Sequence, residues 1–226
     1  MTRLIIWRHG QTTWNVENRI QGQQDVPLDD TGRAQAEAAA DMLAAERVDL
    51  VVSSDLRRAR DTAAAFTART GLPVHTDQRL RERAYGDWEG LTHDEITRRW
   101  PEEFARWKRG ENVPECRLED PSDVAKRVRE ALLDFVDQVG DGTLLVVCHG
   151  GAARQGMGAV LEWPTSVIRA IGPLANCHWS ELRRDKRGWR LSAHNVGPRL
   201  VPHAAVSPDE SAGPEPNGGS DEGARR

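Results

Sequence analysis

Residues 4–10 (LIIWRHG) and residues 144–150 (LLVVCHG) are similar segments, and together they decide the fold. In each, a short apolar run ends at a histidine that is followed by glycine. This pattern predicts two fully buried strands, each stopping at a histidine, with glycine opening the turn. In an open α/β sheet, the carboxyl ends of parallel strands line one crevice. We therefore expect His9 and His149 to meet in one site, with Arg8 beside them.

Apolar runs and turn signals continue an alternation of strands and helices along the chain. Strands are expected at residues 3–7, 48–52, 72–75 and 143–148, helices at 31–46, 55–70, 92–100 and 123–139, and a hairpin of strands at 179–182 and 189–193. Asp30 or Thr31 is the expected N-cap of the helix at 31–46. Thr92 and Glu95 form a capping-box pattern at the start of the helix at 92–100. The alternation predicts an α/β fold with three layers (α/β/α), in which helices cover both faces of a mainly parallel central sheet.

The chain divides into one folded region and a tail. Residues 1–206 carry the strand and helix patterns and are long enough for one sizeable α/β domain. Residues 207–226 are mostly Gly, Pro, Ser and acidic residues, with a net charge of −3 and no apolar anchor. We expect this segment to be a disordered, acidic, Gly/Pro-rich tail.

The composition excludes several classes of partner. A net charge of −4 gives no basic footprint for nucleic acid. No apolar stretch approaches the length that spans a bilayer, and the apolar run at residues 4–7 ends at the charged Arg8, too early for a signal peptide, so no membrane partner is expected. Three cysteines, an odd number without metal-ligand spacing, indicate a reducing, cytoplasmic location without a disulfide framework.

The Arg8-His9-Gly10 turn has the residue types for phosphate chemistry. A neutral imidazole is a good nucleophile toward phosphorus. The guanidinium of Arg8 would neutralise phosphate charge through paired N–H donors, and Gly10 would let the backbone approach the ligand closely. For these three residues alone, a histidine that merely ends a buried strand is an equally good interpretation.

Two further segments supply groups for an anion. Asn15 lies about one helical turn beyond the first histidine loop, where its amide could donate to a phosphate oxygen, and Thr12 would cap the helix between them. A cluster of arginines follows the expected strand at 48–52. Arg57 and Arg60 fit a solvated helix face, whereas Arg58 is followed by a small residue and is the better candidate for the crevice.

A phosphomonoester leaves as an alkoxide that needs a proton. A carboxyl group close to a phosphate dianion retains its proton near neutral pH, because like charge disfavours the ionised form. Glu82, Asp87 and Glu89 are candidates on chemistry alone. His149, once protonated, would stabilise the equatorial oxygens on the other side of the phosphate. Paired histidines also serve as metal ligands, but no metal-binding motif accompanies them, so no metal is expected.

Assembled in order, these segments resemble the histidine phosphatase superfamily, in its phosphoglycerate-mutase-like branch, over about residues 3–195. The motifs that carry the resemblance are at residues 8–15, 22–28, 54–59, 80–90 and 149–151. A series of separated motifs in the family's order is far more specific than any one of them.

The resemblance implies a phosphoglycerate-mutase-like fold and a reaction that needs neither a metal nor another cofactor. It implies that His9 becomes phosphorylated, and that Glu82 protonates the leaving group and then activates water. The positions that would hold the phosphate are Arg8, Asn15, Arg58 and His149. The positions that match substrate-binding residues are Asn15, Gln21, Gly22, Tyr85 and Gly150.

Two features favour a phosphatase over a mutase. The segment between Glu82 and His149 is short for the cap with which a mutase shields its phosphohistidine, and the acidic tail would be repelled by a phosphate pocket. We therefore expect a phosphomonoester hydrolase that acts on a small phosphorylated metabolite. The alternatives are a cofactor-dependent phosphoglycerate mutase and a non-catalytic phospho-ligand binding protein, the second of which requires an incomplete catalytic set.

Finer resemblances suggest a substrate. Gln11, the segment at 21–23 and Asn176 resemble the family's phosphatases of glucosyl-3-phosphoglycerate, which makes that compound a candidate substrate. Lys108 or Arg109 could meet its carboxylate, with ordinary surface charge as the alternative. Gln11 and residues 118–120 depart from patterns common in the family, and the second departure weakens the substrate assignment more than the chemistry. The sequence leaves the oligomeric state open, with a homodimer as one candidate.

Overall fold

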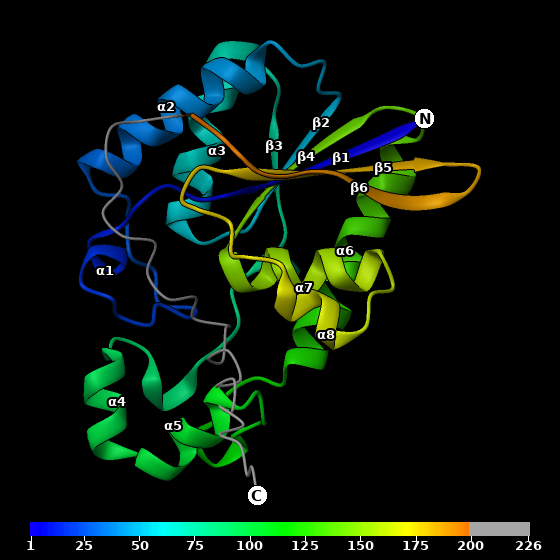
Figure 1. Ribbon diagram of the computed structural model, residues 1–226. Coiled ribbons are helices and arrows are strands. Elements are labelled where there is room, and N and C mark those ends of the chain that lie inside the picture. The colour runs from blue at the N-terminus through cyan, green and yellow to red at the C-terminus, as the bar shows by residue number, and fades with distance from the viewer. Residues whose placement is uncertain (199–226) are drawn as a thin grey trace, which may run out of the picture.

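The computed structural model describes residues 1–198, and its centre is one sheet in the strand order β3-β2-β4-β1-β5-β6 (Figure 1). The strands are β1 (Thr2–Arg8), β2 (Leu50–Ser53), β3 (Val74–Thr76), β4 (Thr143–Cys148), β5 (Trp179–Asp185) and β6 (Gly188–Val196). β4 lies parallel to β1 and to β2, and β2 lies parallel to β3. Only the C-terminal hairpin of β5 and β6 is antiparallel to its neighbours. The predicted mainly parallel sheet is confirmed.

Helices cover both faces of this sheet, which confirms the three layers. The helices are α1 (Thr13–Val16), α2 (Asp30–Ala44), α3 (Arg57–Thr70), α4 (His93–Arg99), α5 (Pro101–Lys108), α6 (Pro121–Val139), α7 (Gly150–Val160) and α8 (Thr165–Ala170), with short 3-10 turns η1 (Gln78–Leu80), η2 (Gly86–Trp88) and η3 (Pro114–Cys116). Alternate side chains of β1 point to opposite faces. Leu4 and Ile6 therefore pack with α6 and α7, whereas Ile5 and Trp7 pack with α2 and α3.

A cap with its own small core stands apart from the sheet (Figure 1). α4, α5 and the turns η2 and η3 bury Trp88, Phe104 and Trp107 against one another, with the two tryptophan rings 5.8 Å apart edge to face. The predicted capping box at the start of α4 is confirmed, since Thr92 and Glu95 bond each other's backbone N–H groups. Pro101, which directly follows the predicted helix at 92–100, begins α5, because proline fits the first position of a helix.

The start of α2 differs from the prediction. Its N-cap is Asp29, not Asp30 or Thr31, and the carboxylate of Asp29 accepts a hydrogen bond of 2.7 Å from the N–H of Gly32. The same side chain accepts from Nε2 of Gln11 at 3.0 Å, so the loop after β1 is joined to the helix start. This tertiary contact selects the capping residue.

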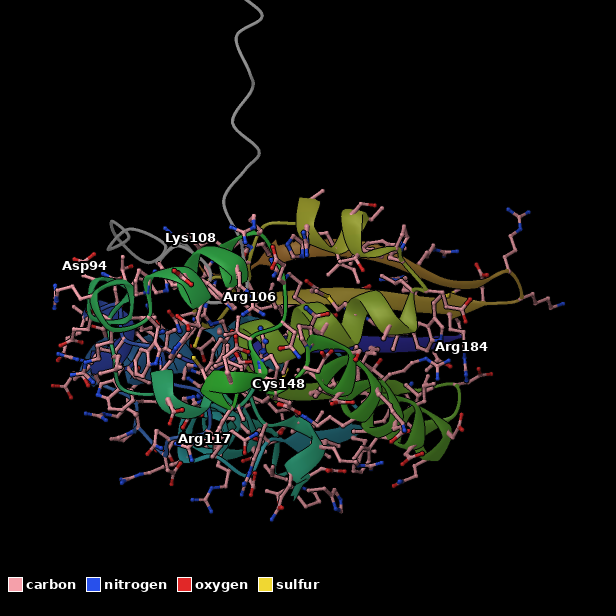
Figure 2. The ribbon with its side chains drawn as sticks, turned by 90° about the horizontal axis from the view of Figure 1, so that it is seen from below. Asp94, Arg106, Lys108, Arg117, Cys148 and Arg184 are labelled. Carbon is pink, nitrogen blue, oxygen red and sulfur yellow. The ribbon has the colours of Figure 1, made fainter. Side chains whose placement is uncertain are left out.

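The topology places a crevice where β1 and β4 end. The chain passes from β1 through the short α1 to α2 on one face, and from β4 directly to α7 on the other face, which is the switch point where α/β folds bind ligands. Figure 2 shows Cys148, the last residue of β4, in the middle of the molecule, between Asp94 of the cap and Arg184 of the hairpin. The crevice is therefore central and faces the cap.

Several other expectations can be compared with the structure. The three cysteines are buried and unbridged, as expected without a disulfide framework. Within residues 1–198, no helix is long and apolar enough to cross a membrane. The predicted tail at residues 207–226 lies outside the described residues, as does the end of the predicted domain at 206.

Candidate active site

The two predicted histidines meet in the crevice. Parallel pairing of Arg8 with Cys148 brings the residues after them, His9 and His149, side by side, with ring centroids 5.2 Å apart and ring planes tilted by 58°. Both side chains are buried, at 3% and 0% exposure. The convergence expected from the two strand-and-histidine segments is confirmed.

His9 has the proton arrangement of a nucleophile. Its Nδ1 lies 2.7 Å from the carbonyl oxygen of Gly10, which can only accept, so Nδ1 carries the proton and Nε2 keeps its lone pair. Burial lowers the pKa of His9 well below its usual value, and the charges of Arg58 and Arg8 lower it further. The ring is therefore neutral at neutral pH, as attack on phosphorus requires.

His149 is held by two polar neighbours. Nε of Arg58 donates to Nδ1 of His149 at 3.2 Å, and Nε2 of His149 lies 2.9 Å from Oγ of Ser54. Since Nδ1 accepts, the ring proton is on Nε2 and is donated to Ser54. Burial lowers the pKa of His149 well below its usual value, and the charges of Arg58 and Arg8 lower it further. His149 is therefore neutral here, and its protonation beside a bound phosphate stays a prediction.

Arg58 is the buried member of the arginine cluster, as predicted. It is fully buried, whereas Arg57 and Arg60 on the same helix are exposed. Its two terminal nitrogens donate to the carbonyl oxygens of Gln24 and Gly22, each at 2.7 Å. The guanidinium therefore brings positive charge to the histidines and also fixes the loop that contains Gly22.

Arg8 lies on the same side of the crevice as the start of α7. Its Nη1 donates to the carbonyl oxygen of Leu174 at 2.6 Å, while its Nε is buried without a hydrogen-bond partner among residues 1–198. A methyl group built at Gly150 would be 3.5 Å from the guanidinium carbon of Arg8, which is ordinary contact. A buried donor of this kind is well placed to receive an anion's oxygen.

The carboxylate of Glu82 lies at the N-terminus of α7, the helix that begins directly after His149. Its Oε1 accepts from the N–H groups of Arg83 at 2.7 Å and Ala152 at 2.9 Å, and its Oε2 accepts from Gly151 at 2.9 Å. A β-carbon at Gly151 would lie 2.6 Å from Oε1, so glycine is needed for this close approach. Oε2 has a single N–H donor and is therefore the oxygen with more room for a transferable proton.

The other two candidates for the proton donor, Asp87 and Glu89, make contacts outside the pair of histidines. Asp87 pairs with Arg117 outside the crevice. The Oε1 atom of Glu89 accepts from the backbone N–H groups of Gln23 and Tyr85, both at 3.0 Å. Glu89 thus ties two substrate-side segments together, and Glu82 alone among the three lies beside the histidines.

Two of the predicted substrate-binding residues are joined to the site by hydrogen bonds: Gly22 through Arg58, and Asn15 through Asn176, which also donates to the carbonyl oxygen of His9. Oδ1 of Asn15 accepts from the backbone N–H of Thr12 at 3.0 Å, within the capping box that begins α1, so its Nδ2 is the donating end of the amide. Gln21 and Tyr85 are buried, and Tyr85 lies under the guanidinium of Arg83 at 5.2 Å. The role of these residues in substrate binding stays a prediction.

Gly10 has a packing role that the sequence analysis did not predict. A β-carbon at Gly10 would lie 2.4 Å from the carbonyl oxygen of Gly32, and one at Gly32 would lie 2.0 Å from the carbonyl oxygen of Gln11. Glycine is required here because the loop after β1 packs directly against the start of α2. Close approach of the Gly10 backbone to a ligand stays a prediction.

Sequence reasoning missed three residues that support the site. Ser54 orients His149, while Glu119 and Arg127 hold the segment that carries Glu82. Arg127 donates to Glu119 at 2.7 Å and to the carbonyl oxygens of Arg79, Arg81 and Glu82. The only signal in the sequence was the unusual turn that contains Glu119, which identified a departure but not its partner.

Two remaining expectations concern charge and metals. Lys108 lies over the ring of Phe104 at 4.7 Å, and Arg109 pairs with Glu111 at 2.7 Å, so both follow the surface-charge interpretation. Within residues 1–198, no group of three or more His, Cys, Asp or Glu side chains is placed to hold a metal ion. Independence from metals stays a prediction for experiment.

Comparison with known proteins identifies the family. The sequence matches the histidine phosphatase superfamily (branch 1) over residues 4–197. A glucosyl-3-phosphoglycerate phosphatase of Mycobacterium tuberculosis is 40% identical over 215 residues, covering 88% of this chain and 96% of the relative. A probable phosphoglycerate mutase of Yersinia pestis is 31% identical over 195 residues, covering 85% of this chain and 89% of the relative.

Solved structures agree with this match. The structure of a mycobacterial glucosyl-3-phosphoglycerate phosphatase in complex with VO3 has a TM-score of 0.78 and 37% identity, over 86% of this chain and 99% of its own. The family model alone spans most of the chain. This chain therefore belongs to the histidine phosphatase superfamily.

Proposed function

We propose that this protein hydrolyses phosphomonoesters of small metabolites through a phosphohistidine at His9. The observation that supports it best is the pair of neutral, buried imidazoles 5.2 Å apart, beside the charge of Arg58 and Arg8. Rings this close can both contact one phosphoryl group placed beside them, His9 through Nε2 and His149 through Nδ1. The arginines would compensate the phosphate's charge in a site where water is excluded.

The reaction divides into two displacements. In the first, the lone pair of Nε2 of His9 forms a bond to phosphorus while the ester P–O bond breaks, and Glu82 gives its proton to the departing oxygen. In the second, Glu82 as carboxylate takes a proton from water, the water oxygen bonds to phosphorus, and the P–N bond breaks to release inorganic phosphate and neutral His9. His149, protonated on Nδ1 once phosphate is bound, would donate to an equatorial oxygen in both steps.

The substrate proposed for this site is glucosyl-3-phosphoglycerate. Support comes from the relative of that name, which matches at 40% identity over nearly its whole length. Residues 1–206 would form the catalytic domain, and a homodimer and a cytoplasmic location complete the proposal. The partner required by the chemistry is one small phosphorylated metabolite.

Hydrolysis of an aryl phosphate in the presence of EDTA tests the core of this proposal. His9→Ala should lower kcat by more than about a thousandfold, because the nucleophile is lost. His75→Ala is the matched control, since His75 is an exposed histidine on β3 and should leave the rate unchanged. Activity retained in His9→Ala would refute the phosphohistidine, and activity lost in EDTA would refute independence from metals.

A mutase is the second candidate, since a probable phosphoglycerate mutase is 31% identical to this chain. The two functions differ in what receives the phosphoryl group from His9, water or a second hydroxyl of glycerate. Incubation with 2- and 3-phosphoglycerate should release inorganic phosphate faster than it exchanges the two isomers. If the two phosphoglycerate isomers interconvert much faster than inorganic phosphate is released, the protein is a mutase and not a phosphatase.

A further inference from the structure

A cavity of about 530 Å³ lies between the cap and the α7–α8 side of the domain. We call it the cap-side cavity. Distant parts of the chain line it, including Arg83, Trp107, Asp120, Arg154 and Trp163. Its volume falls in the range of pockets that hold small organic ligands, and it is large for a bare three-carbon acid.

The cavity begins beside the catalytic carboxyl group. Gly151, which lines it, donates its N–H to Oε2 of Glu82 at 2.9 Å. Arg83 and Tyr85, which also line it, follow Glu82 directly in the chain. Because Glu82 would protonate the oxygen that leaves phosphorus, the organic part of a substrate would extend past Glu82 into this cavity.

Two buried arginines give the cavity a site for a second anion. Arg83 and Arg154 are 7% and 4% exposed. Nη2 of Arg83 is buried without a hydrogen-bond partner among residues 1–198. Buried guanidinium groups are costly unless they face negative charge, and their planar fork fits a carboxylate. The nearby Asp120 accepts from the backbone N–H and the hydroxyl of Ser122 and from Nδ2 of Asn112, and these hydrogen bonds, together with the charge of Arg83, lower its pKa.

The outer part of the cavity has a different character. Trp163 is half-buried there, and Trp107 contributes a second indole from the cap. Asn112, Gln155 and Glu162 add amide and carboxylate groups to the lining. Aromatic faces pack on the C–H face of a sugar ring, and amides and carboxylates pair with its hydroxyl groups.

We propose that the cap-side cavity binds the leaving group of a glycosylated glycerate phosphate, with Arg154 and Arg83 on its carboxylate and Trp163 on its sugar. The inference rests on the proposed function, because it requires Glu82 to face the leaving oxygen. It goes further in assigning Arg154 and Trp163 as residues that select the substrate. Arg154 is rigidly placed for this, since it stands on α7 two positions after Ala152, whose N–H holds Glu82.

Three substrates test the carboxylate contact and the sugar contact separately. They are glucosyl-3-phosphoglycerate, 3-phosphoglycerate and an aryl phosphate. Arg154→Met should lower kcat/KM about tenfold or more for both carboxylate substrates, mainly through KM, and by less than about threefold for the aryl phosphate. Trp163→Leu should lower kcat/KM for the glucosyl compound alone. Arg129→Met is the control, since Arg129 donates to the carbonyl oxygen of Ala159 and does not line the cavity.

The outcomes distinguish this inference from the proposed function. If the unmodified protein hydrolyses none of the three substrates, the function itself fails. If it hydrolyses the aryl phosphate while Arg154→Met lowers all three rates equally, or none, only the cavity assignment is overturned. If Arg154→Met does not fold, Arg154→Lys replaces it, because lysine keeps the positive charge but lacks the planar guanidinium group. Arg154→Lys should show a smaller loss of kcat/KM, again greater for the two carboxylate substrates than for the aryl phosphate. Trp163→Leu, at a half-exposed position, tests the sugar contact independently.

Discussion

Nε of Arg58 lies 3.2 Å from Nδ1 of His149, and this contact determines where the proton of the second imidazole resides. An arginine can only donate, so Nδ1 must accept and Nε2 must carry the hydrogen, which is directed to Ser54 at 2.9 Å. When phosphate arrives, Nδ1 must gain a proton to donate to it. The hydroxyl of Ser54 then keeps the ring in place while its charge changes.

Ser54→Ala tests this arrangement. Removal of the hydroxyl leaves the buried Nε2–H of His149 without its acceptor, which costs about 1–3 kcal/mol, or roughly tenfold or more in rate if it is felt in the transition state. We expect kcat to fall at least tenfold while KM changes less than threefold in steady-state assays. Ser53→Ala is the control, because the Ser53 hydroxyl donates to the carbonyl oxygen of Ser54 instead. Equal rates in the two variants would exclude the orienting role.

The pH dependence of kcat/KM follows from the two proton requirements. An ordinary histidine gains a proton as the pH falls through about 6.5. Burial, and then the charges of Arg58 and Arg8, lower the pKa of His9, so this nucleophile stays neutral at a more acid pH than an ordinary histidine does. The acid limb of the profile should therefore lie below the pH at which an ordinary histidine titrates, and the alkaline limb should report loss of the proton that the leaving group needs. The rate should peak at mildly acid to neutral pH. A rate that still rises steeply above pH 9 would contradict the assigned roles.

The same two histidines make the fold sensitive to acid. Each has a pKa well below 6.5 when folded, so below pH 6.5 the unfolded chain binds protons that the native state does not. The stabilisation is fully present above pH 6.5 and is lost progressively as the pH falls below that value. Urea unfolding at pH 7.5 and 5.5 should show a smaller fall for His149→Gln than for the unmodified protein. His75→Gln, at an exposed position, should retain the full fall.

The strands and the pair of histidines could be predicted because their signal is local. β4 was predicted with its bounds, and β1 to within one residue at each end, because a buried parallel strand is a continuous apolar run between polar neighbours. His149 followed from the same pattern. α8 was missed because it is only six residues long and has no side-chain cap. Its position depends on packing against α7, which no local pattern records.

The supporting residues of the site could not be predicted for a related reason. Glu89 and Arg127 act on backbone groups of Gln23 and Glu82, and each such pair joins segments far apart in the chain. A single sequence shows a charged residue at each position but not its partner. A lone glutamate or arginine reads equally well as solvated surface, so these contacts appear only once the fold brings the segments together.

Glu89→Gln should loosen the substrate side of the site. Oε1 of Glu89 accepts two backbone N–H groups and Oε2 accepts from Nε2 of Gln24 at 2.9 Å, so either orientation of an amide sets an NH2 group against a donor. We expect kcat/KM to fall about tenfold and Tm to fall by roughly 2–4 °C for each kcal/mol lost. Glu130→Gln, at an exposed position of α6, is the matched control. Unchanged kinetics in Glu89→Gln would show that the two segments hold their positions without it.

Gly32→Ala tests why the loop after β1 needs glycine. A methyl group at Gly32 would lie 2.0 Å from the carbonyl oxygen of Gln11 and 2.7 Å from its backbone nitrogen, and rigid backbone cannot move aside as a flexible side chain can. We expect a loss of about 1–3 kcal/mol in the free energy of unfolding, measured by urea denaturation, because the start of α2 must shift away from β1.

Gly172→Ala is the control for that substitution, since nothing lies within 4 Å of a methyl group there and its backbone is not left-handed. It should be neutral or slightly stabilising, because alanine narrows the unfolded ensemble. If Gly32→Ala is instead as stable as Gly172→Ala, the helix start can move at no cost. In that case a fall in kcat for Gly32→Ala would show that the loop beside His9 moves with the helix start.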